Sequence, residues 1–231
     1  MINYILTVSL SMNEEITATE EQTLTIQQAI DLAVQHHTAG DLPKAEGIYQ
    51  QVLQAEPNQP VALHLLGVIA HQVGKNDISV DLITKALTIK PDYAEAHNNL
   101  GLTLQELGQF DEAVTSYNEA IAIKPEYAEA YYNLGNTLQA LGHLNNAVAS
   151  YSKAIVIKPD FSEAHCNLGN SLKKFGNHNE ASTSYNMALS IKPDYAEAHS
   201  NLGNVLRELK RFDEVVASCS KALSIKPDYA E

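Results

Sequence analysis

The sequence has no tryptophan, two cysteines and only 15 basic residues, which are outnumbered by 28 acidic ones. The net charge of −13 argues against binding to nucleic acid or to anionic membrane surfaces, because both depend on a basic excess. No apolar run approaches the roughly 18 residues of a membrane-spanning helix. The first basic residue is Lys44, so the N-terminus lacks the basic region of a secretory signal.

The use of cysteine and the N-terminus indicate where the protein works. Cys166 and Cys219 lie 53 residues apart, a spacing that fits neither a disulfide framework nor a zinc site. Together with the missing secretory signal, this spacing predicts a cytoplasmic protein. Met12 opens a polar run near the start of the chain, so Met1 and Met12 are both candidates for the true start codon.

A repeat of 34 residues organises most of the chain. Proline recurs at this step from Pro57 to Pro227, in phase with Leu-Gly pairs from Leu66-Gly67 to Leu202-Gly203. Two independent markers in phase indicate a solenoid of stacked units. Six copies occupy residues 26–59, 60–93, 94–127, 128–161, 162–195 and 196–229. We expect residues 1–25 to be partly disordered or folded back, and residues 230–231 to begin a truncated seventh repeat of a longer protein.

Each copy contains the signals of two helices, here called helix A and helix B. A glycine is expected to end helix A, at Gly74, Gly108, Gly142 and Gly176. A Lys-Pro pair ends helix B, because lysine complements the negative helix end and proline stops propagation. An acidic pair with capping-box spacing precedes helix A, at Asp92/Glu95, Asp160/Glu163 and Asp194/Glu197. No segment shows sustained period-two alternation, so we expect no sheet.

The order Leu-Gly, Gly, Ala, Tyr, Ala, Pro within this frame resembles the tetratricopeptide repeat over residues 26–229. The resemblance implies an all-α fold, a right-handed superhelical solenoid of antiparallel helix pairs, with helix A lining a concave groove. It also implies a protein or peptide as the binding partner. Repeat six departs from the pattern at Lys210, Val215 and Cys219, so we expect it to pack less tightly.

Asparagines recur on the face of helix A that should line the groove. They stand at positions six and nine of the repeat, which share one helix face. The set comprises Asn99, Asn133, Asn136, Asn167, Asn170, Asn201 and Asn204. Helix propensity does not explain them, and an amide offers both a donor and an acceptor to the main chain of an extended peptide. The set resembles the asparagine-lined groove of O-linked N-acetylglucosamine transferases. Groove binding is the favoured interpretation; bonds between neighbouring helices are the alternative.

Charged residues flank this face. Position two is acidic at Glu95, Glu129, Glu163 and Glu197. These glutamates either form a groove rim that selects basic peptides or cap their helices, and we favour capping. A small basic cluster lies at Lys173, Lys174 and Arg207, in positions twelve and thirteen. It either steers an acidic ligand or forms a solvated face, and we favour the solvated face.

Repeat two replaces the asparagines with an apolar groove patch of Val61, Leu65 and Val68. Either an apolar side chain of a partner docks there or the N-terminal segment covers it. We favour coverage, because residues 1–25 contain apolar side chains with no other surface to pack on. These side chains are Ile2, Tyr4, Ile5, Leu6 and Leu24.

The repeats carry no recognisable catalytic chemistry. The chain has no phosphate-binding glycine loop, HExxH or GxSxG motif. His97, His165 and His199 share position four, but no cysteine or carboxylate joins them as a metal ligand, so we expect core histidines. Cys166, at the expected groove edge, has no basic neighbour in the sequence to lower the pKa of its thiol. We therefore expect no enzyme activity, metal or small-molecule cofactor in this chain.

Two functions remain open from the sequence. The first is a protein–protein interaction scaffold that binds an extended segment of a partner in the concave groove. The second is the substrate-recruiting arm of a larger transferase whose catalytic domain lies beyond residue 231. The resemblance implies an O-linked N-acetylglucosamine transferase-like glycosyltransferase in that case, or a sulfotransferase or methyltransferase. We favour the scaffold.

Overall fold

The structure is a computed structural model that describes residues 5–11 and 19–227, with side chains from Thr23 onward. Within these residues the chain forms twelve helices and one two-stranded hairpin. It divides into two compact units, residues 1–109 and 110–231. The prediction of a helical repeat fold is confirmed. Met1, Ile2, Tyr4 and Met12, with the start of the predicted seventh repeat, lie outside the described residues.

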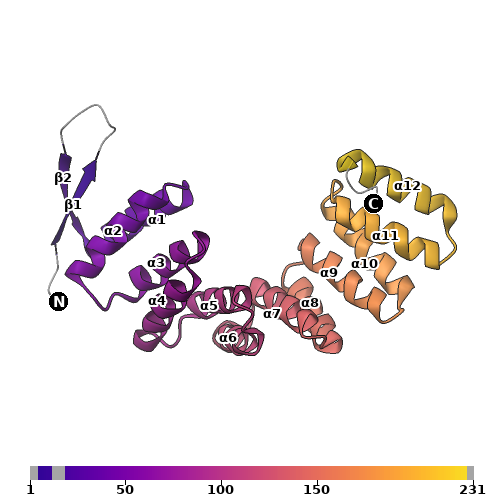
Figure 1. The fold of residues 1–231 in the computed structure, drawn as a ribbon, viewed down its shortest axis with the longest axis horizontal. Helices are drawn as coiled ribbons and strands as arrows, with labels where there is room; N and C mark the ends of the chain where they lie inside the picture. The colour runs from indigo at the N-terminus through magenta and orange to yellow at the C-terminus, as the bar shows by residue number, and fades with distance from the viewer. Residues whose placement is uncertain (1–4, 12–18, 228–231) are drawn as a thin grey trace. The chain divides into compact units, whose positions relative to one another are not determined.

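The first unit contains the hairpin and five helices, each packed beside the next (Figure 1). Its elements are β1 (Ile5–Ser11), β2 (Thr19–Thr25), α1 (Ile26–Thr38), α2 (Leu42–Ala55), α3 (Pro60–Gln72), α4 (Asn76–Ile89) and α5 (Ala94–Glu106). The odd-numbered helices are the expected A helices, and the even-numbered ones are the B helices.

The second unit continues the same alternation. Its helices are α6 (Phe110–Ile123), α7 (Ala128–Ala140), α8 (Leu144–Ile157), α9 (Ser162–Lys174), α10 (His178–Ile191), α11 (Ala196–Glu208) and α12 (Phe212–Ile225). Each helix again contacts its neighbours in sequence, and α9 also contacts α7 and α11.

The N-terminal hairpin contradicts the prediction that the chain has no sheet. Strand β1 pairs antiparallel with β2, with Ile5 opposite Thr25 and Ser11 opposite Thr19. The reason lies in the sequence of β1, ILTVSLS, which alternates apolar and polar residues with the period of a strand. The hairpin contacts α1 and α2.

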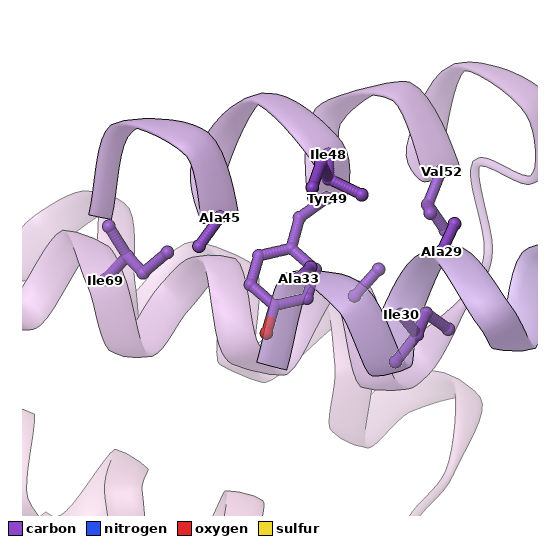
Figure 2. Close-up of a cluster of buried hydrophobic side chains, with 9 residues drawn as sticks. Ala29, Ile30, Ala33, Ala45, Ile48, Tyr49, Val52 and Ile69 are labelled. Carbon is purple, nitrogen blue, oxygen red and sulfur yellow. The ribbon is translucent and has the colours of Figure 1, made fainter. Parts of the chain in front are cut away.

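The core of the first unit is centred on Tyr49. In Figure 2 the Tyr49 ring extends from α2 toward α1, where Ala33 and Ile30 lie, and Ile69 of α3 joins the same buried cluster. Tyr49 is completely buried, and burial raises the pKa of its hydroxyl to about 12. Small residues on α1 therefore admit a large ring from α2, as the 34-residue pattern predicts.

The second unit repeats this packing with glycine as the partner of the ring. A Cβ at Gly135 would lie 2.6 Å from Cε1 of Tyr151, and one at Gly169 would lie 2.8 Å from Cε1 of Tyr185. Both tyrosines are completely buried. At Gly67 and Gly203 the close neighbour is Ile83 or Cys219 instead, at 2.7 Å. The Leu-Gly pairs therefore recur because only glycine admits the side chain of helix B at this distance.

The predicted capping boxes at the starts of the A helices are wrong. The N-cap residues are Tyr93, Phe161 and Tyr195, none of which forms a side-chain cap bond. Each aspartate of the predicted pairs therefore stands one residue before the N-cap, and its glutamate is the second helical residue instead of the third. A capping box does form at Thr25 and Gln28, before α1.

The turn between helices A and B requires a left-handed residue. Five repeats place glycine there, with φ between 74° and 82°, at Gly40, Gly74, Gly108, Gly142 and Gly176. The sixth repeat places Lys210 there with φ of 59°. A left-handed conformation costs a residue with a Cβ about 1 kcal/mol relative to glycine.

We predict that Lys210→Gly stabilises the second unit by about 1 kcal/mol, because it relieves this left-handed strain. The mirror variant, Gly176→Ala, should destabilise by a similar amount. No atom lies within 4 Å of a Cβ at Gly176, so its effect reports backbone strain alone. Urea unfolding followed by circular dichroism measures both changes. A Lys210→Gly variant no more stable than the wild type would contradict the assignment.

Candidate functional site

Six of the seven predicted groove asparagines lie on the A helices of the second unit. We call these six the amide face. They project from α7, α9 and α11, two from each helix and one turn apart: Asn133, Asn136, Asn167, Asn170, Asn201 and Asn204. Five are partly exposed and Asn204 is exposed. The repeat therefore places amides at the same two positions on each of three A helices.

At α7 and α9 the amides are engaged between helices. The Oδ1 of Asn136 accepts hydrogen bonds from the hydroxyl of Tyr151, at 2.9 Å, and from Nδ2 of Asn167, at 2.9 Å. Nδ2 of Asn167 also donates to the hydroxyl of Tyr132, at 3.2 Å. Here the alternative interpretation holds: these amides join neighbouring repeats.

Asn170 also bonds a tyrosine and a neighbouring asparagine, but one of its N–H hydrogens is left without an acceptor in the described chain. Its Oδ1 accepts from the hydroxyl of Tyr185 at 2.7 Å, and its Nδ2 donates to Oδ1 of Asn167 at 3.4 Å. One Nδ2 hydrogen of Asn170 then remains for another acceptor, since an amide nitrogen carries two.

At α11 the amides are open. Asn201 Oδ1 accepts from the ammonium of Lys173 at 3.2 Å, and in the described residues its Nδ2 has no partner. Asn204 stands where Asn136 and Asn170 stand in their repeats, but the residue that follows it by 15 positions is Cys219 in place of tyrosine. Without that hydroxyl, no group of the described chain bonds the Asn204 amide. The amide face thus has an engaged part at α7–α9 and an open end at α11.

Two of the four position-two glutamates form ion pairs within their own repeats. Glu129 pairs with Lys158 at 3.3 Å, and Glu163 pairs with Lys192 at 3.7 Å. Partial burial alone would raise the pKa of Glu163. Its own backbone N–H, the Ser162 hydroxyl and the charge of Lys192 outweigh burial and hold that pKa below its usual value.

The lysine that ends each B helix has a further contact. Its ammonium lies 4.6 to 4.9 Å from the centre of the aromatic ring three residues later, a cation–π geometry. The four pairs are Lys90/Tyr93, Lys124/Tyr127, Lys158/Phe161 and Lys192/Tyr195. Lys158 and Lys192 therefore connect the end of helix B to two places. One is the aromatic ring of the loop that follows, and the other is the glutamate at the start of helix A in the same repeat.

The basic cluster has fewer partners. Apart from its bond to Asn201, Lys173 has no partner in the described chain, and no carboxylate there lies within ion-pair distance of Lys174 or Arg207. Lys174 and Arg207 are both exposed. This cluster borders the open end of the amide face, because Lys173 reaches Asn201 directly.

In the first unit, the seventh asparagine joins a buried histidine. Asn99 Nδ2 lies 2.8 Å from Nε2 of His64, and Nδ1 of His64 lies 2.9 Å from the hydroxyl of Tyr93. An amide nitrogen only donates, so Nε2 accepts and the ring proton is on Nδ1. Burial lowers the pKa of His64 to about 4, against an upward pull from Glu95. This contact joins residues 35 positions apart, and no local pattern in the sequence indicates it.

The apolar groove patch divides in two. Val61 and Leu65 pack partly buried against the core of the first unit, as does Leu24 at the end of the hairpin. Val68 instead lines a hollow of about 340 Å³ together with Asn99 and Leu102. Nothing is described of the side chains of Ile5 and Leu6, so coverage by the N-terminal segment remains a prediction.

The remaining candidates have structural contacts. His97, His165 and His199 each place Nε2 about 3 Å from the carbonyl of the proline six residues earlier, at 2.9, 3.1 and 3.0 Å. Cys166 is completely buried, not at a groove edge, and burial raises the pKa of its thiol to about 12. In the described residues, no three histidine, cysteine or acidic side chains form a metal-binding group.

Comparison with protein-family models identifies the repeat. A tetratricopeptide repeat model matches residues 128–161 and 196–229, and a second matches residues 82–115. A TPR repeat model matches residues 104–142 and 169–210. Together the matches cover more than half of the chain. This chain belongs to the tetratricopeptide repeat family. Two of the matches begin and end on the 34-residue frame derived from the prolines.

Solved structures of tetratricopeptide repeat (TPR) proteins share the fold. A crystal structure of MamA matches with a TM-score of 0.66 and 26% identity, covering 71% of this chain and 96% of MamA. Pseudomonas aeruginosa PilF matches with a TM-score of 0.80 and 18% identity, covering 87% and 92%. YrrB, described as a TPR protein with an unusual peptide-binding site, matches with a TM-score of 0.66 and 19% identity, covering 78% and 93%.

Two further results are negative. No curated protein matches the sequence significantly. In the part of the chain that the structure describes, no helix has both the length and the apolar character to cross a membrane.

We predict that Asn136→Ala destabilises the second unit by about 1–3 kcal/mol, because the buried hydroxyl of Tyr151 loses its acceptor. Asn204→Ala is the matched control: it makes the same change at the same repeat position, where no intrachain bond is lost. It should leave stability unchanged or slightly raised through better helix propensity. Urea unfolding measures both. Equal destabilisation by the two variants would refute the division into engaged and open parts.

We predict that acid weakens the first unit through His64. Its pKa falls from 6.5 to about 4 on folding, so below pH 6.5 the unfolded chain binds a proton that the folded chain does not. Stability is therefore lost as the pH falls from 6.5 to 4, by about 3 kcal/mol in total. His64→Gln removes this proton uptake and keeps the other acid-sensitive groups. If the difference in the free energy of unfolding between the wild type and His64→Gln stays constant from pH 6.5 to pH 4, the effect is excluded.

Proposed function

We propose that this TPR chain is a protein–protein interaction scaffold that binds an extended segment of a partner along the amide face. The observation that supports the proposal is the open end of that face at α11. Asn204 and Nδ2 of Asn201 keep hydrogen-bonding capacity that the described chain does not use, although their counterparts in α7 and α9 are engaged.

An amide at such a place is suited to a peptide main chain. Extended backbone offers unpaired N–H and C=O groups, and each side-chain amide can pair with either. The engaged amides at α7 and α9 hold the helices in register, so the open amides project from rigid elements. Rigid placement lowers the entropy lost when a ligand binds.

Two other observations agree with this proposal. In the described residues no three histidine, cysteine or acidic side chains form a metal-binding group, and the thiol of Cys166 is completely buried. YrrB, whose fold this chain shares, is described as having a peptide-binding site. The alternative role as the recruiting arm of a larger transferase would use the same face and remains a hypothesis.

We predict that Asn204→Ala weakens peptide binding about tenfold, which corresponds to one or two lost hydrogen bonds. The probe is the tightest binder selected from a phage-displayed library of random dodecapeptides, resynthesised with fluorescein and measured by fluorescence anisotropy. Asn186→Ala is the matched control, because Asn186 is also an exposed asparagine without an intrachain bond but lies on helix B, in α10.

Circular dichroism should show that both variants fold as the wild type does. A peptide that binds Asn204→Ala and the wild type equally would contradict the role of the amide face. A library that yields no binder at all would contradict the proposed function.

A further inference from the structure

We infer that the open end of the amide face is a hydrogen-bond-donor surface that selects an acidic extended segment, whose carboxylates bind at Lys173, Lys174 and Arg207. This inference rests on the proposed function and names the chemistry of the partner. The three basic residues are defined here as the basic edge.

The first argument is the polarity that the scaffold imposes on the amides. Asn170 Oδ1 is occupied by the Tyr185 hydroxyl, and Asn201 Oδ1 by Lys173. An ammonium has no acceptor, so Lys173 fixes which end of the Asn201 amide turns toward it. Asn170 and Asn201 therefore direct N–H groups toward a ligand, and such groups take acceptors: main-chain carbonyls or carboxylates.

The second argument is the imbalance of ion pairs on this face. The acidic positions at the starts of α7 and α9 are compensated, because Glu129 pairs with Lys158 and Glu163 with Lys192. In the described chain no carboxylate compensates Lys174 or Arg207. A rim that has its own cations gives little attraction to a basic peptide, whereas uncompensated cations attract an acidic one.

The net charge of −13 does not prevent such binding. Charges separated by more than about 8 Å are largely screened at physiological ionic strength, so local contacts dominate once the ligand is bound. The acidic remainder of the chain instead restricts where an anionic segment can bind. Charge complementarity therefore favours the basic edge over other surfaces.

The third argument is spacing. Lys173 and Arg207 occupy the same position in successive repeats, on α9 and α11. Packed helix axes lie about 10 Å apart, which a segment in the extended polyproline II conformation spans in roughly one turn of three residues, so that every third side chain points the same way. A segment with an acidic residue at every third position would then present one carboxylate to each repeat while its carbonyls reach the amides. Guanidinium and ammonium groups both bind carboxylates through charge-assisted hydrogen bonds.

The test uses three fluorescein-labelled dodecapeptides of glycine and serine that carry glutamate, glutamine or lysine at every third position. Fluorescence anisotropy with the full chain measures their affinities at low and high salt. We expect the glutamate peptide to bind at least tenfold more tightly than the glutamine peptide at 50 mM salt, with most of this advantage lost at about 500 mM. The lysine peptide should bind most weakly.

Charge-reversal variants locate the effect. The double variant Lys174→Glu with Arg207→Glu should abolish the advantage of the glutamate peptide over the glutamine peptide. Lys153→Glu is the control, because Lys153 is an exposed lysine on α8, away from the basic edge. Both proteins should unfold at the wild-type temperature, because none of these three side chains has an intrachain partner in the described residues.

The outcomes separate the two proposals. Equal binding of the glutamate and glutamine peptides would overturn the selection for acidic segments and leave the scaffold function standing. Preference for the lysine peptide would also overturn the selection for acidic segments. It would support the other interpretation, in which the position-two glutamates form a rim that selects basic peptides. Absence of binding by all three peptides would count against the scaffold function itself, and the inference would fall with it.

Discussion

The contact between the tyrosine of one helix and the small residue of its neighbour is the constraint on which the rest of the structure depends. In the second unit Tyr151 and Tyr185 lie so close to Gly135 and Gly169 that a Cβ could not be added without displacement. A single helix pair buries too little surface to be stable alone, so each ring contributes to a stack whose stability is shared between neighbours. The 34-residue period reflects that contact, because the residues that form it recur at this spacing along the chain.

The same tyrosines connect the core to the amide face. Their rings are buried, but their hydroxyls end at Asn136 and Asn170 on the amide face. Core packing thereby decides which end of each amide is turned inward. Where the tyrosine is replaced by Cys219, the amide of Asn204 is left open. The departure of repeat six from the repeat pattern thus leaves an amide without an intrachain partner in the described residues.

Ion pairs act differently on the two ends of the A helices. At their starts, Lys158 and Lys192 each combine a cation–π contact with a glutamate pair, which joins the end of helix B to the start of helix A. At the ends of α9 and α11, Lys174 and Arg207 have no such carboxylate in the described chain. An exposed ion pair contributes little stability, so this asymmetry matters more for the electrostatic potential of the face than for folding.

The sequence by itself determined the helical repeat, its frame, the left-handed turns and the tyrosine–glycine packing, because each depends on residues at fixed offsets along the chain. The alternation in β1 is also present in the sequence, but it spans only seven residues beside a helical period that extends over six repeats. Only the tertiary structure decided that Asn136 and Asn167 are engaged while Asn204 is open. It also decided that His64 and Asn99 meet and that Glu129 and Glu163 pair with Lys158 and Lys192. These outcomes depend on side chains 15 to 35 residues apart that meet only when helices pack, and no local pattern encodes which atoms of such a pair come within hydrogen-bond distance.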